Sequence, residues 1–323
     1  MESSKSRFTD PVSEAIEASL DRFVFPGQAI VVGLSGGLDS TVLLHALCEP
    51  AGRRGLRLSS LHIHHALSPN ADRWADHCRA LTAAWEVPFS VVRVEVERGS
   101  ADGLEAAARR ARHAAFAGAD AEWVALAHHG DDQAETLIFN LLRGTGLAGA
   151  AGMAELNGKL LRPLLSVPRE ELRRYAERHQ VHWIEDESND DTRFSRNHVR
   201  HEVLAGLERR FPGSKSNLGA AARRFREALD LLDDLAVLDL GGLADFPVPV
   251  GAFAKLAEPR ARNALRYLLQ KNRIGIPSEE RLRELLRQLI EAAADRHPEA
   301  TFGRWRIFRR AGLVCAECLQ DGA

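Results

Sequence analysis

The hexapeptide Ser35–Ser40, Ser-Gly-Gly-Leu-Asp-Ser, has the residue types that bind a phosphate group. It lies between a continuous apolar run, Ala29–Leu34, and a helical pattern that begins at Ser40. Two adjacent glycines let the backbone turn tightly and approach an anion. The main-chain N–H groups of such a turn, with the following helix N-terminus, form a phosphate cradle to which Ser35 and Ser40 would add hydroxyl donors. Asp39 would repel phosphate, so this carboxylate is predicted to bind Mg²⁺ beside a polyphosphate.

A second polar cluster is predicted in the segment Ala127–Glu135, directly after another apolar run. Asp132 and Glu135 are three residues apart, so a helix would place both carboxylates on one face. Such a pair can bind an ammonium group or a metal ion. Asp131 lies off that face and is expected to cap the helix. Zinc is the less favoured ligand, because the histidine pair before these acids has no thiolate or spaced third histidine beside it.

Two arginine-rich patterns also have helical spacing. Arg109 and Arg112 are three residues apart, and Glu105 precedes Arg109 by four. Arg196 and Arg200 are four apart and follow an acidic stretch. Taken alone, patterns of this kind are more often exposed, salt-bridged helices than catalytic sites.

Four short apolar runs alternate with helical patterns through the first 140 residues. The runs are Ala29–Leu34, Leu58–Ile63, Phe89–Val96 and Trp123–Ala127, and the helical patterns cover 40–47, 71–85, 103–117 and 131–142. Four strand–helix units in series predict an α/β fold, a parallel sheet with helices on both faces. Ligands bind such sheets at the carboxyl ends of the strands. The glycine loop, the carboxylate pair and three histidines, His62, His64 and His65, are all predicted there.

The remainder of the chain has a different pattern. It contains a Gly-rich segment expected on the surface, Arg143–Gly152, a short apolar run, Leu160–Leu165, and a helical pattern, Pro168–His179. We predict a domain boundary at Phe211-Pro-Gly213, which gives an N-terminal domain of residues 1–213 and a small C-terminal domain of residues 214–323. The latter is expected to be mainly helical, with a long helix over 217–240, further helices over 260–270 and 278–291, and a closing hairpin made by 300–309 and 312–316. Ser278 is the predicted N-cap.

Composition and charge exclude several classes of protein. The chain has 323 residues, 45% hydrophobic and 27% charged, which is ordinary for a globular protein. No apolar run approaches the roughly 20 residues of a membrane span, the first residues do not resemble a signal peptide, and four cysteines do not make a disulfide scaffold. We therefore expect a cytoplasmic protein with no membrane partner, either monomer or homodimer. Residues 1–213 have 25 Lys and Arg against 30 Asp and Glu, and residues 214–323 have 18 against 15.

In combination these segments resemble the tRNA(Ile)-lysidine synthetases, a family of the ATP pyrophosphatase-loop group. The hexapeptide Ser35–Ser40 after a first strand is specific to that loop, and it differs from a Walker A loop, which ends in Gly-Lys-Ser/Thr. The other matching segments occur in the family's order and are His62–Leu67, Glu105 with Arg109 and Arg112, Ala127–Thr136, Arg143–Gly146, Arg162–Leu165, Glu185–Asn189 and Arg196–Arg200. The likeness covers roughly residues 28–211. His64 stands where many members have Asn, and His113 where many have Tyr.

The resemblance implies a two-step reaction and an adenine nucleotide α-hydrolase-like fold. Members of the family use ATP to adenylate the C2 carbonyl oxygen of the wobble cytidine in the CAU anticodon of tRNA(Ile), and pyrophosphate is released. The ε-amine of free L-lysine then attacks C2 and displaces AMP, which leaves lysidine.

Roles for individual residues are carried over by position in these motifs. The residues implied to contact ATP are Ser35, Gly36, Gly37, Leu38, Asp39, Ser40, His62 and His128, with Mg²⁺ on Asp39. Asp132 and Glu135 would hold the lysine ammonium group. The implied catalytic residues are Asp39, Arg109, Arg112, Asp132, Glu135 and Arg200, and the motif does not choose between Arg109 and Arg112. The implied tRNA contacts are Arg143, Arg162, Arg196 and Asn197.

The sequence leaves two alternative functions open. A tRNA thiolase of the same loop family needs cysteines near the active site to carry sulfur or an iron–sulfur cluster. Cys315 and Cys318 form a C-x-x-C at the chain's end, while Cys48 and Cys78 are expected to be buried hydrophobic residues. An ATP-binding module without turnover is the other alternative, but it has no need of a full polar set in one cleft.

Overall fold

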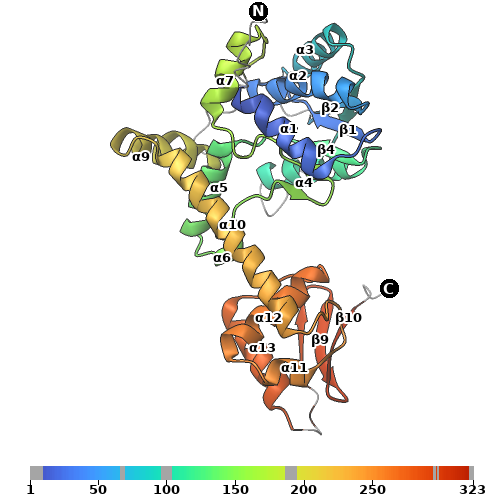
Figure 1. Ribbon diagram of the computed structural model, residues 1–323, viewed down its shortest axis with the longest axis vertical. Coiled ribbons are helices and arrows are strands. Elements are labelled where there is room, and N and C mark those ends of the chain that lie inside the picture. Colours follow the sequence, from blue (N-terminus) through green and yellow to red (C-terminus); the bar gives the residue numbers. More distant parts are fainter. Residues whose placement is uncertain are drawn as a thin grey trace, which may run out of the picture. The chain divides into compact units, whose positions relative to one another are not determined.

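The computed structural model describes residues 10–65, 70–95, 104–185, 195–293, 296 and 298–319. The chain forms two compact units, Met1–Arg226 and Glu227–Ala323. The boundary between them along the chain falls within one long helix, α10 (Ser214–Asp239) (Figure 1). Within the described part of the chain, no helix combines the length and the apolar character that crossing a membrane requires.

The first unit is built on a six-stranded sheet whose strand order is β3-β2-β1-β4-β6-β5. Its strands are β1 (Ala29–Gly33), β2 (Arg57–His64), β3 (Phe89–Arg93), β4 (Trp123–Ala125), β5 (Leu156–Asn157) and β6 (Leu160–Leu161). The pairs β1–β2, β2–β3, β1–β4 and β4–β6 are parallel, and β5 is antiparallel to β6. The predicted parallel sheet is therefore confirmed. Only the first two residues of the apolar run 160–165 form a strand. The strand order reverses between β1 and β4, and such switch points are where ligands bind open α/β sheets.

Helices cover both faces of this sheet, as predicted. The helices of the first unit are α1 (Pro11–Phe23), α2 (Leu38–Arg53), α3 (Ala71–Ala84), α4 (Leu104–Ala117), α5 (Gly130–Leu142), α6 (Leu147–Ala150), α7 (Arg169–Arg178), α8 (Ser195–His198), the π-helical turn η2 (Val199–Leu204) and α9 (Ala205–Arg210). Alternate residues of β1 divide between two cores. Ile30 and Val32 pack with α1, α2 and α7, whereas Val31 packs with Phe116 of α4. A strand buried on both faces explains the continuous apolar run.

Two segments differ from the sequence-based expectation. The Gly-rich segment Arg143–Gly152 is not wholly a surface loop, because it contains α6, and Ala150 and Ala151 are buried. The two units divide after Arg226, within α10, rather than at Gly213. The cause is packing: Ala222 of α10 shares a buried cluster with Leu137 and Ala150, which holds the first half of the helix to the first unit.

The second unit combines helices with a sheet of four antiparallel strands in the order β7-β10-β9-β8. Its elements are β7 (Val248–Pro249), α11 (Val250–Ala254), α12 (Glu258–Lys271), α13 (Glu279–Glu291), β8 (Glu299–Phe302), β9 (Trp305–Arg310) and β10 (Leu313–Cys318). The predicted closing hairpin exists as β9 and β10, but a further strand precedes it. A turn at Gly303, with φ of +57°, splits the segment 300–309 into β8 and β9. Ser278 caps α13 as predicted: its hydroxyl accepts a hydrogen bond from the Arg281 N–H at 3.4 Å.

Candidate active site

The loop Ser35–Ser40 joins β1 to α2 with a geometry that requires glycine. Gly36 has φ of +88°, a backbone conformation that residues other than glycine rarely adopt. A Cβ atom at this position would lie 3.1 Å from Cys78 Sγ and 3.2 Å from Ile184 Cδ1. The carbonyl oxygen of Gly36 also accepts a hydrogen bond from the Ile184 N–H at 3.0 Å. The loop is therefore held against a segment almost 150 residues away by contacts that no larger residue would allow.

The two serine hydroxyls of the loop bond to each other and to its backbone. The Ser35 and Ser40 Oγ atoms are 3.0 Å apart, and the Ser35 N–H donates to Ser40 Oγ at 3.1 Å. The Ser40 hydroxyl also donates to the Gly37 carbonyl at 3.2 Å. These bonds fix the loop's shape from within. The predicted role of the hydroxyls as phosphate donors stays a prediction.

The second polar cluster lies at the end of the neighbouring strand β4, and His129 connects it to the loop. His129 Nε2 is 3.6 Å from Asp39 Oδ2 and 3.5 Å from Asp132 Oδ2. The His129 backbone N–H donates to Asp132 Oδ2 at 3.0 Å, which closes the first turn of α5. The His129 side chain is only 2% exposed. Burial lowers the pKa of His129, but the charges of Asp132 and Asp39 outweigh burial and raise it. The carboxylates after β1 and β4 thus share one site.

Asp39 lies in the first turn of α2 and is about one-third exposed. Its Oδ1 lies 3.2 Å from Nε of Arg169, the first residue of α7. Burial raises the pKa of Asp39, but His129 and Arg169 outweigh it and hold the pKa below its usual value. An ionised, accessible carboxylate beside a phosphate-binding loop fits Mg²⁺, which is usually held by one or two carboxylates and the substrate's phosphates. No group of three His, Cys, Asp or Glu side chains suited to a metal occurs among the described residues, so a zinc site is not supported.

Arg200 contacts both carboxylates of the predicted lysine-binding pair. Its Nη2 donates to Asp132 Oδ1 at 3.0 Å and to Glu135 Oε2 at 3.2 Å, and its Nε donates to Glu135 Oε1. Arg200 comes from the π-helical turn η2. Burial raises the pKa of Glu135 more than Arg200 lowers it. The predicted pairing of the two acids is confirmed in space, while Arg200 lies beside them as a counter-ion.

The histidines at the strand ends have distinct surroundings. His62 is buried, and its Nδ1 lies 2.9 Å from the Leu34 carbonyl oxygen, so it joins β2 to the end of β1. Burial lowers the pKa of His128 to about 3, and the positive charges of Arg162, Arg112 and Arg196 act in the same direction. His128 is therefore a neutral imidazole. The negative charge of Asp132 acts in the opposite direction but does not outweigh burial.

The remaining predicted residues have varied positions. Arg143 is exposed at the end of α5, with its guanidinium 5.4 Å from the Phe139 ring centroid. Arg196 donates to the Thr136 hydroxyl at 3.2 Å, and Asn197 is half-buried beside it in the chain. Arg162 is 6% exposed and donates to the Ala154 carbonyl at 2.8 Å, so its burial does not favour a direct contact with tRNA. The side chains of Glu105 and Arg109, and residues 186–194, lie outside the part of the chain that the structure describes.

A network beyond the loop gave no motif in the sequence, and the predicted role of Asp131 as a helix cap is wrong. Asp131 does not cap its own helix: its Oδ1 accepts a hydrogen bond from the Arg169 N–H at 3.1 Å, at the start of α7. Its Oδ2 accepts from Lys215 Nζ at 3.0 Å, in the first turn of α10. Arg169 and Lys215 are new residues of the site. The one available signal was an arginine in the first turn of a helix, where acidic residues are preferred.

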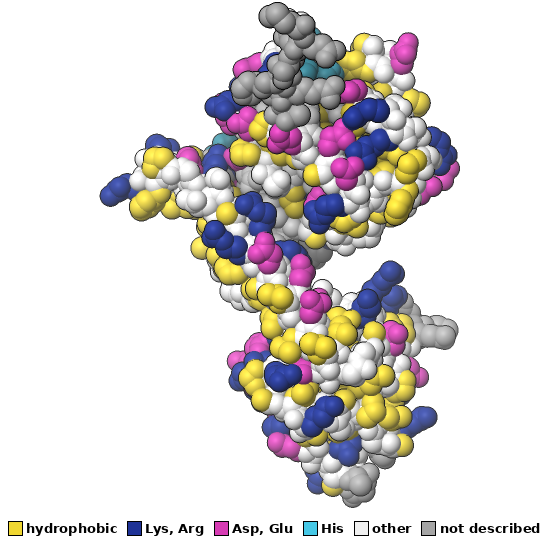
Figure 2. All heavy atoms as spheres, viewed as in Figure 1, with side chains coloured by type: hydrophobic (Ala, Val, Ile, Leu, Met, Phe, Trp, Pro, Cys, Tyr) yellow, Lys and Arg dark blue, Asp and Glu magenta, His cyan; other side chains and the backbone are white. Residues whose placement is uncertain are grey.

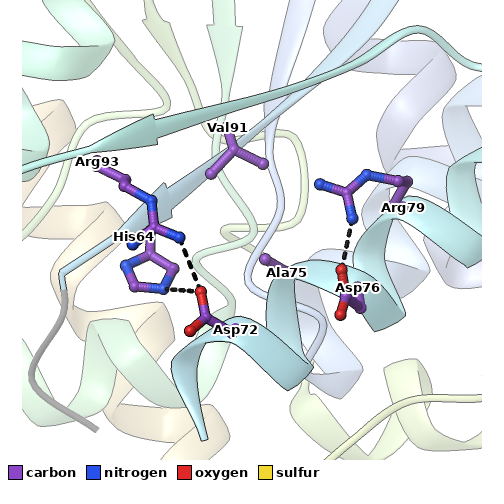
Figure 3. A pocket seen from close by; sticks show the side chains of 7 residues that line it. All are labelled: His64, Asp72, Ala75, Asp76, Arg79, Val91 and Arg93. Carbon is purple, nitrogen blue, oxygen red and sulfur yellow. Dashed lines mark hydrogen bonds and ion pairs between the residues drawn. The ribbon is translucent and has the colours of Figure 1, made fainter. Parts of the chain in front are cut away.

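A hollow of about 440 Å³ lies apart from this cluster, between α3 and the strands β2 and β3. Figure 3 shows that its charged side chains point toward one another. Asp72 Oδ1 accepts hydrogen bonds from His64 Nε2 at 3.1 Å and Arg93 Nη2 at 2.8 Å, and Asp76 pairs with Arg79. Because these charges are mutually neutralised, the hollow is not the site indicated by the motifs.

Two family models match the chain, one in each of its two parts. Residues 9–207 match the family of the PP-loop domain, and residues 249–314 match the TilS substrate binding domain. The fold of a U34-tRNA thiolase, NcsA from Methanococcus maripaludis with its [4Fe-4S] cluster, is similar, with a TM-score of 0.56, 18% identity and coverage of 67% of this chain and 78% of that one.

Curated relatives found by sequence have a higher identity to this chain than the thiolase has. The tRNA(Ile)-lysidine synthase of Aromatoleum aromaticum is 45% identical over 269 residues, which are 82% of this chain and 64% of that protein. That of Nitrosomonas europaea is 39% identical over 322 residues, 97% of this chain and 70% of that protein. The chain thus spans about two thirds of the length of these relatives. The PP-loop match and the relative matched over nearly the whole chain establish that the chain belongs to the tRNA(Ile)-lysidine synthase family of PP-loop proteins.

Proposed function

We propose that the protein uses ATP to join free L-lysine to C2 of the wobble cytidine in the CAU anticodon of tRNA(Ile), with release of AMP and pyrophosphate. The observation that carries this proposal is the juxtaposition of Asp39 and Asp132, both within 3.6 Å of the same imidazole nitrogen of His129. The glycine loop, proposed to bind phosphate, and the acid pair, proposed to bind the ammonium group, are thus adjacent at the strand switch point. Membership of the family supports the choice of substrates.

The first step would use the phosphate side of the site. The C2 carbonyl oxygen of cytidine attacks the α-phosphorus of ATP, the bond to the bridging oxygen breaks, and pyrophosphate leaves. The N-terminus of α2, with the glycine turn before it, would offer backbone N–H donors to the phosphates. Asp39 would hold Mg²⁺, which neutralises phosphate charge when bound. Arg112, whose charge acts on His65 and His128, is the described member of the arginine pair.

The second step would use the carboxylate side. Lysine attacks C2 through its ε-nitrogen, AMP leaves with the bonding electron pair, and the ammonium group must lose a proton before it can attack. Asp132 and Glu135 carry two negative charges when ionised, and Arg200 neutralises one of them. The ammonium group of lysine would share Asp132 with Arg200 and His129. Because burial raises the pKa of Glu135, this carboxylate is the proposed proton acceptor, and Asp132 would orient the amine.

The second unit is proposed to contact the tRNA. It contains the match to the TilS substrate binding domain, residues 249–314, and its charges are nearly balanced, with 14 Lys and Arg against 15 Asp and Glu. Figure 2 shows Lys and Arg side chains on its visible face, interspersed with acidic ones. Contacts of this kind with phosphates weaken as salt rises. In the first unit, Arg143, Arg196 and Asn197 are the proposed tRNA contacts.

A sulfur-transferring function is not favoured by the positions of the cysteines. Cys315 and Cys318 lie on β10 in the second unit, whereas Cys48 and Cys78 belong to helices of the first. Cys78 is buried, and burial raises the pKa of its thiol to about 12, which leaves it unreactive at neutral pH.

The test is mass spectrometry of anticodon nucleosides after incubation with ATP, lysine and a tRNA(Ile) transcript that has a CAU anticodon. We expect lysidine in the product and one AMP for each lysidine formed. The matched control is a transcript with uridine at the wobble position, which has no C4 amino group and should give neither product. AMP without a lysine adduct, a thiolated nucleoside, or ATP binding without turnover would each overturn the proposal.

A further inference from the structure

Arg169 is the first residue of α7, and the structure places its guanidinium beside the glycine loop. Its Nε lies 3.2 Å from Asp39 Oδ1, and 45% of its side chain is exposed. Its backbone N–H is fixed by Asp131, which is itself held by Lys215. Among the described residues, no partner contacts the two terminal nitrogens of the guanidinium. The main chain of Arg169 is thus anchored. Within the described residues, the four N–H donors on its terminal guanidinium nitrogens are available for a ligand beside the glycine loop.

The charge of the loop explains why a cation is needed there. Ser35–Ser40 contains no lysine or arginine and one carboxylate, in contrast to a Walker A loop, whose lysine reaches the phosphates. Cleavage between the α- and β-phosphates creates a pyrophosphate group with several negative charges. Backbone N–H groups contribute only partial charges toward it. A guanidinium that presents paired donors matches phosphate oxygens in geometry and in sign.

The position of Arg169 in its helix is unfavourable for the helix itself. A positive charge in the first turn opposes the helix macrodipole, which favours acidic residues there. The next two residues, Glu170 and Glu171, follow that preference. Helix stability therefore does not account for an arginine at this position, whereas an anionic ligand in front of it would.

His129 is a second polar group in contact with Asp39. It is buried, and its Nε2 lies 3.6 Å from Asp39 Oδ2 and 3.5 Å from Asp132 Oδ2. Asp39 is thus contacted by an arginine and a histidine, two side chains that can donate hydrogen bonds to phosphate oxygens. The loop, Arg169 and His129 together surround Asp39 with groups that suit a polyphosphate.

We propose that Arg169 binds the β- and γ-phosphates of ATP and stabilises the pyrophosphate as it leaves, exchanging its ion pair with Asp39 for phosphate oxygens. The proposal rests on the proposed function for the identity of the reaction. Arg169 would donate hydrogen bonds without transferring a proton. The electron pair of the broken bond stays with the bridging oxygen, on pyrophosphate.

The test measures binding of inorganic pyrophosphate, so that it does not depend on turnover. Isothermal titration with Mg²⁺ and pyrophosphate compares the wild-type protein with Arg169→Ala and Arg169→Lys. We expect affinity to fall at least about tenfold in Arg169→Ala and less in Arg169→Lys, which keeps the charge but loses the planar fork. The matched control is Arg173→Ala, an exposed arginine of the same helix that should bind as the wild type does.

A second readout separates this role from a structural one. In single-turnover assays, release of pyrophosphate should slow by about 10²-fold in Arg169→Ala, while its thermal unfolding midpoint should match that of Arg173→Ala. Unchanged pyrophosphate affinity in Arg169→Ala overturns the proposal. A wild-type protein that binds pyrophosphate but makes no lysidine would instead contradict the proposed function, and the two failures are therefore distinguishable.

Discussion

The two halves of the site are held together in different ways. The backbone of the glycine loop Ser35–Ser40 is shaped mainly by hydrogen bonds between its own residues, and distant segments add contacts through Ile184, His129 and Arg169. The carboxylate pair is fixed by Arg200, which lies 65 residues from Glu135 in the chain. The backbone of the phosphate side is thus largely a local structure. The amine side exists only after separate segments have packed together.

This difference bears on how each half can receive a ligand. The loop offers backbone N–H donors that need not move, since its hydroxyls already hold it in shape. The acids are paired with Arg200, so a substrate ammonium must share them with a guanidinium. We infer that ATP meets a preformed surface, and that lysine meets an ion-pair cluster which rearranges to accept it.

The largest expected effect comes from breaking the amine side alone. Asp132→Asn removes the charge that orients the ammonium group, so transfer of lysine should fall by about 10³-fold. The first half-reaction uses the other side, so ATP–pyrophosphate exchange in the presence of tRNA should stay measurable. Asp76→Asn, which alters an exposed acid of the same unit, is the control. If both half-reactions fell or survived equally, the separation of the two sides would be wrong.

Breaking the phosphate side is expected to have the opposite selectivity. Gly36→Ala forces a side chain into a positive φ and places Cβ against Cys78 and Ile184. We expect ATP affinity to fall by about 10²-fold and stability by about 1–3 kcal/mol, with lysine affinity retained. Gly27→Ala is the matched control, because Gly27 has φ of +81° but nothing within 4 Å of the added Cβ. It should lose stability by about 1 kcal/mol with ATP affinity unchanged.

Removing Arg200 tests how the amine side is held together, through its effect on the free energy of unfolding. Arg200→Gln leaves the buried Glu135 and the half-buried Asp132 without their counter-ion, and we expect a loss of about 2 kcal/mol at pH 8. Because the folded-state pKa of Glu135 is already raised, its ionised form destabilises the fold, and this penalty grows without Arg200. The penalty disappears as pH falls and Glu135 becomes protonated. Denaturant unfolding at pH 8 and pH 5 should therefore show a smaller difference from wild type at pH 5.

The control for this measurement is Arg174→Gln, which breaks exposed ion pairs with Glu170 and Glu171. Exposed pairs contribute little, so its effect should stay below about 0.5 kcal/mol at both pH values. An Arg200→Gln protein whose loss of stability does not depend on pH would show that Glu135 has another source of compensation.

The same contrast explains what the sequence could predict. The loop could be recognised because its chemistry is contained in six consecutive residues between a strand and a helix. The pairing of Asp132 with Glu135 followed from helical spacing, and the adjacency of Asp39 followed from parallel strand topology. The sheet was predictable because a strand buried on both faces, such as β1, must be continuously apolar.

The parts that could not be predicted depend on contacts between distant segments. Asp131 had the composition and position of a helix cap, but its carboxylate bonds the start of α7, 38 residues away. Arg169 gave no motif because its partner, Asp39, lies 130 residues earlier. The boundary between the units moved into α10 because small residues such as Ala222 pack on α5 and α6, which periodicity along one helix does not reveal.

The smallest expected effect concerns the scaffold of the amine side. The Glu208 carboxylate accepts hydrogen bonds from the Gly213 N–H at 2.6 Å, the Ser214 hydroxyl at 2.7 Å and the Lys215 N–H at 3.1 Å, and so caps α10. Glu208→Gln should lower stability by about 0.5 kcal/mol at pH 7, as for other exposed caps. The hydrogen bonds hold the pKa of Glu208 below its usual value of 4.5, so its contribution is present above pH 4.5 and is lost as pH falls through the folded-state pKa.

Urea unfolding at pH 7 and pH 3 checks this, and the difference between Glu208→Gln and wild type should be smaller at pH 3. Since Glu208 follows Arg200 along the same helical segment, the variant should also weaken lysine binding slightly, by less than about threefold, while ATP affinity stays unchanged. An equal loss for both ligands would mean that the loop depends on the distant scaffold after all. In that case the division between a locally formed phosphate side and an assembled amine side would not hold.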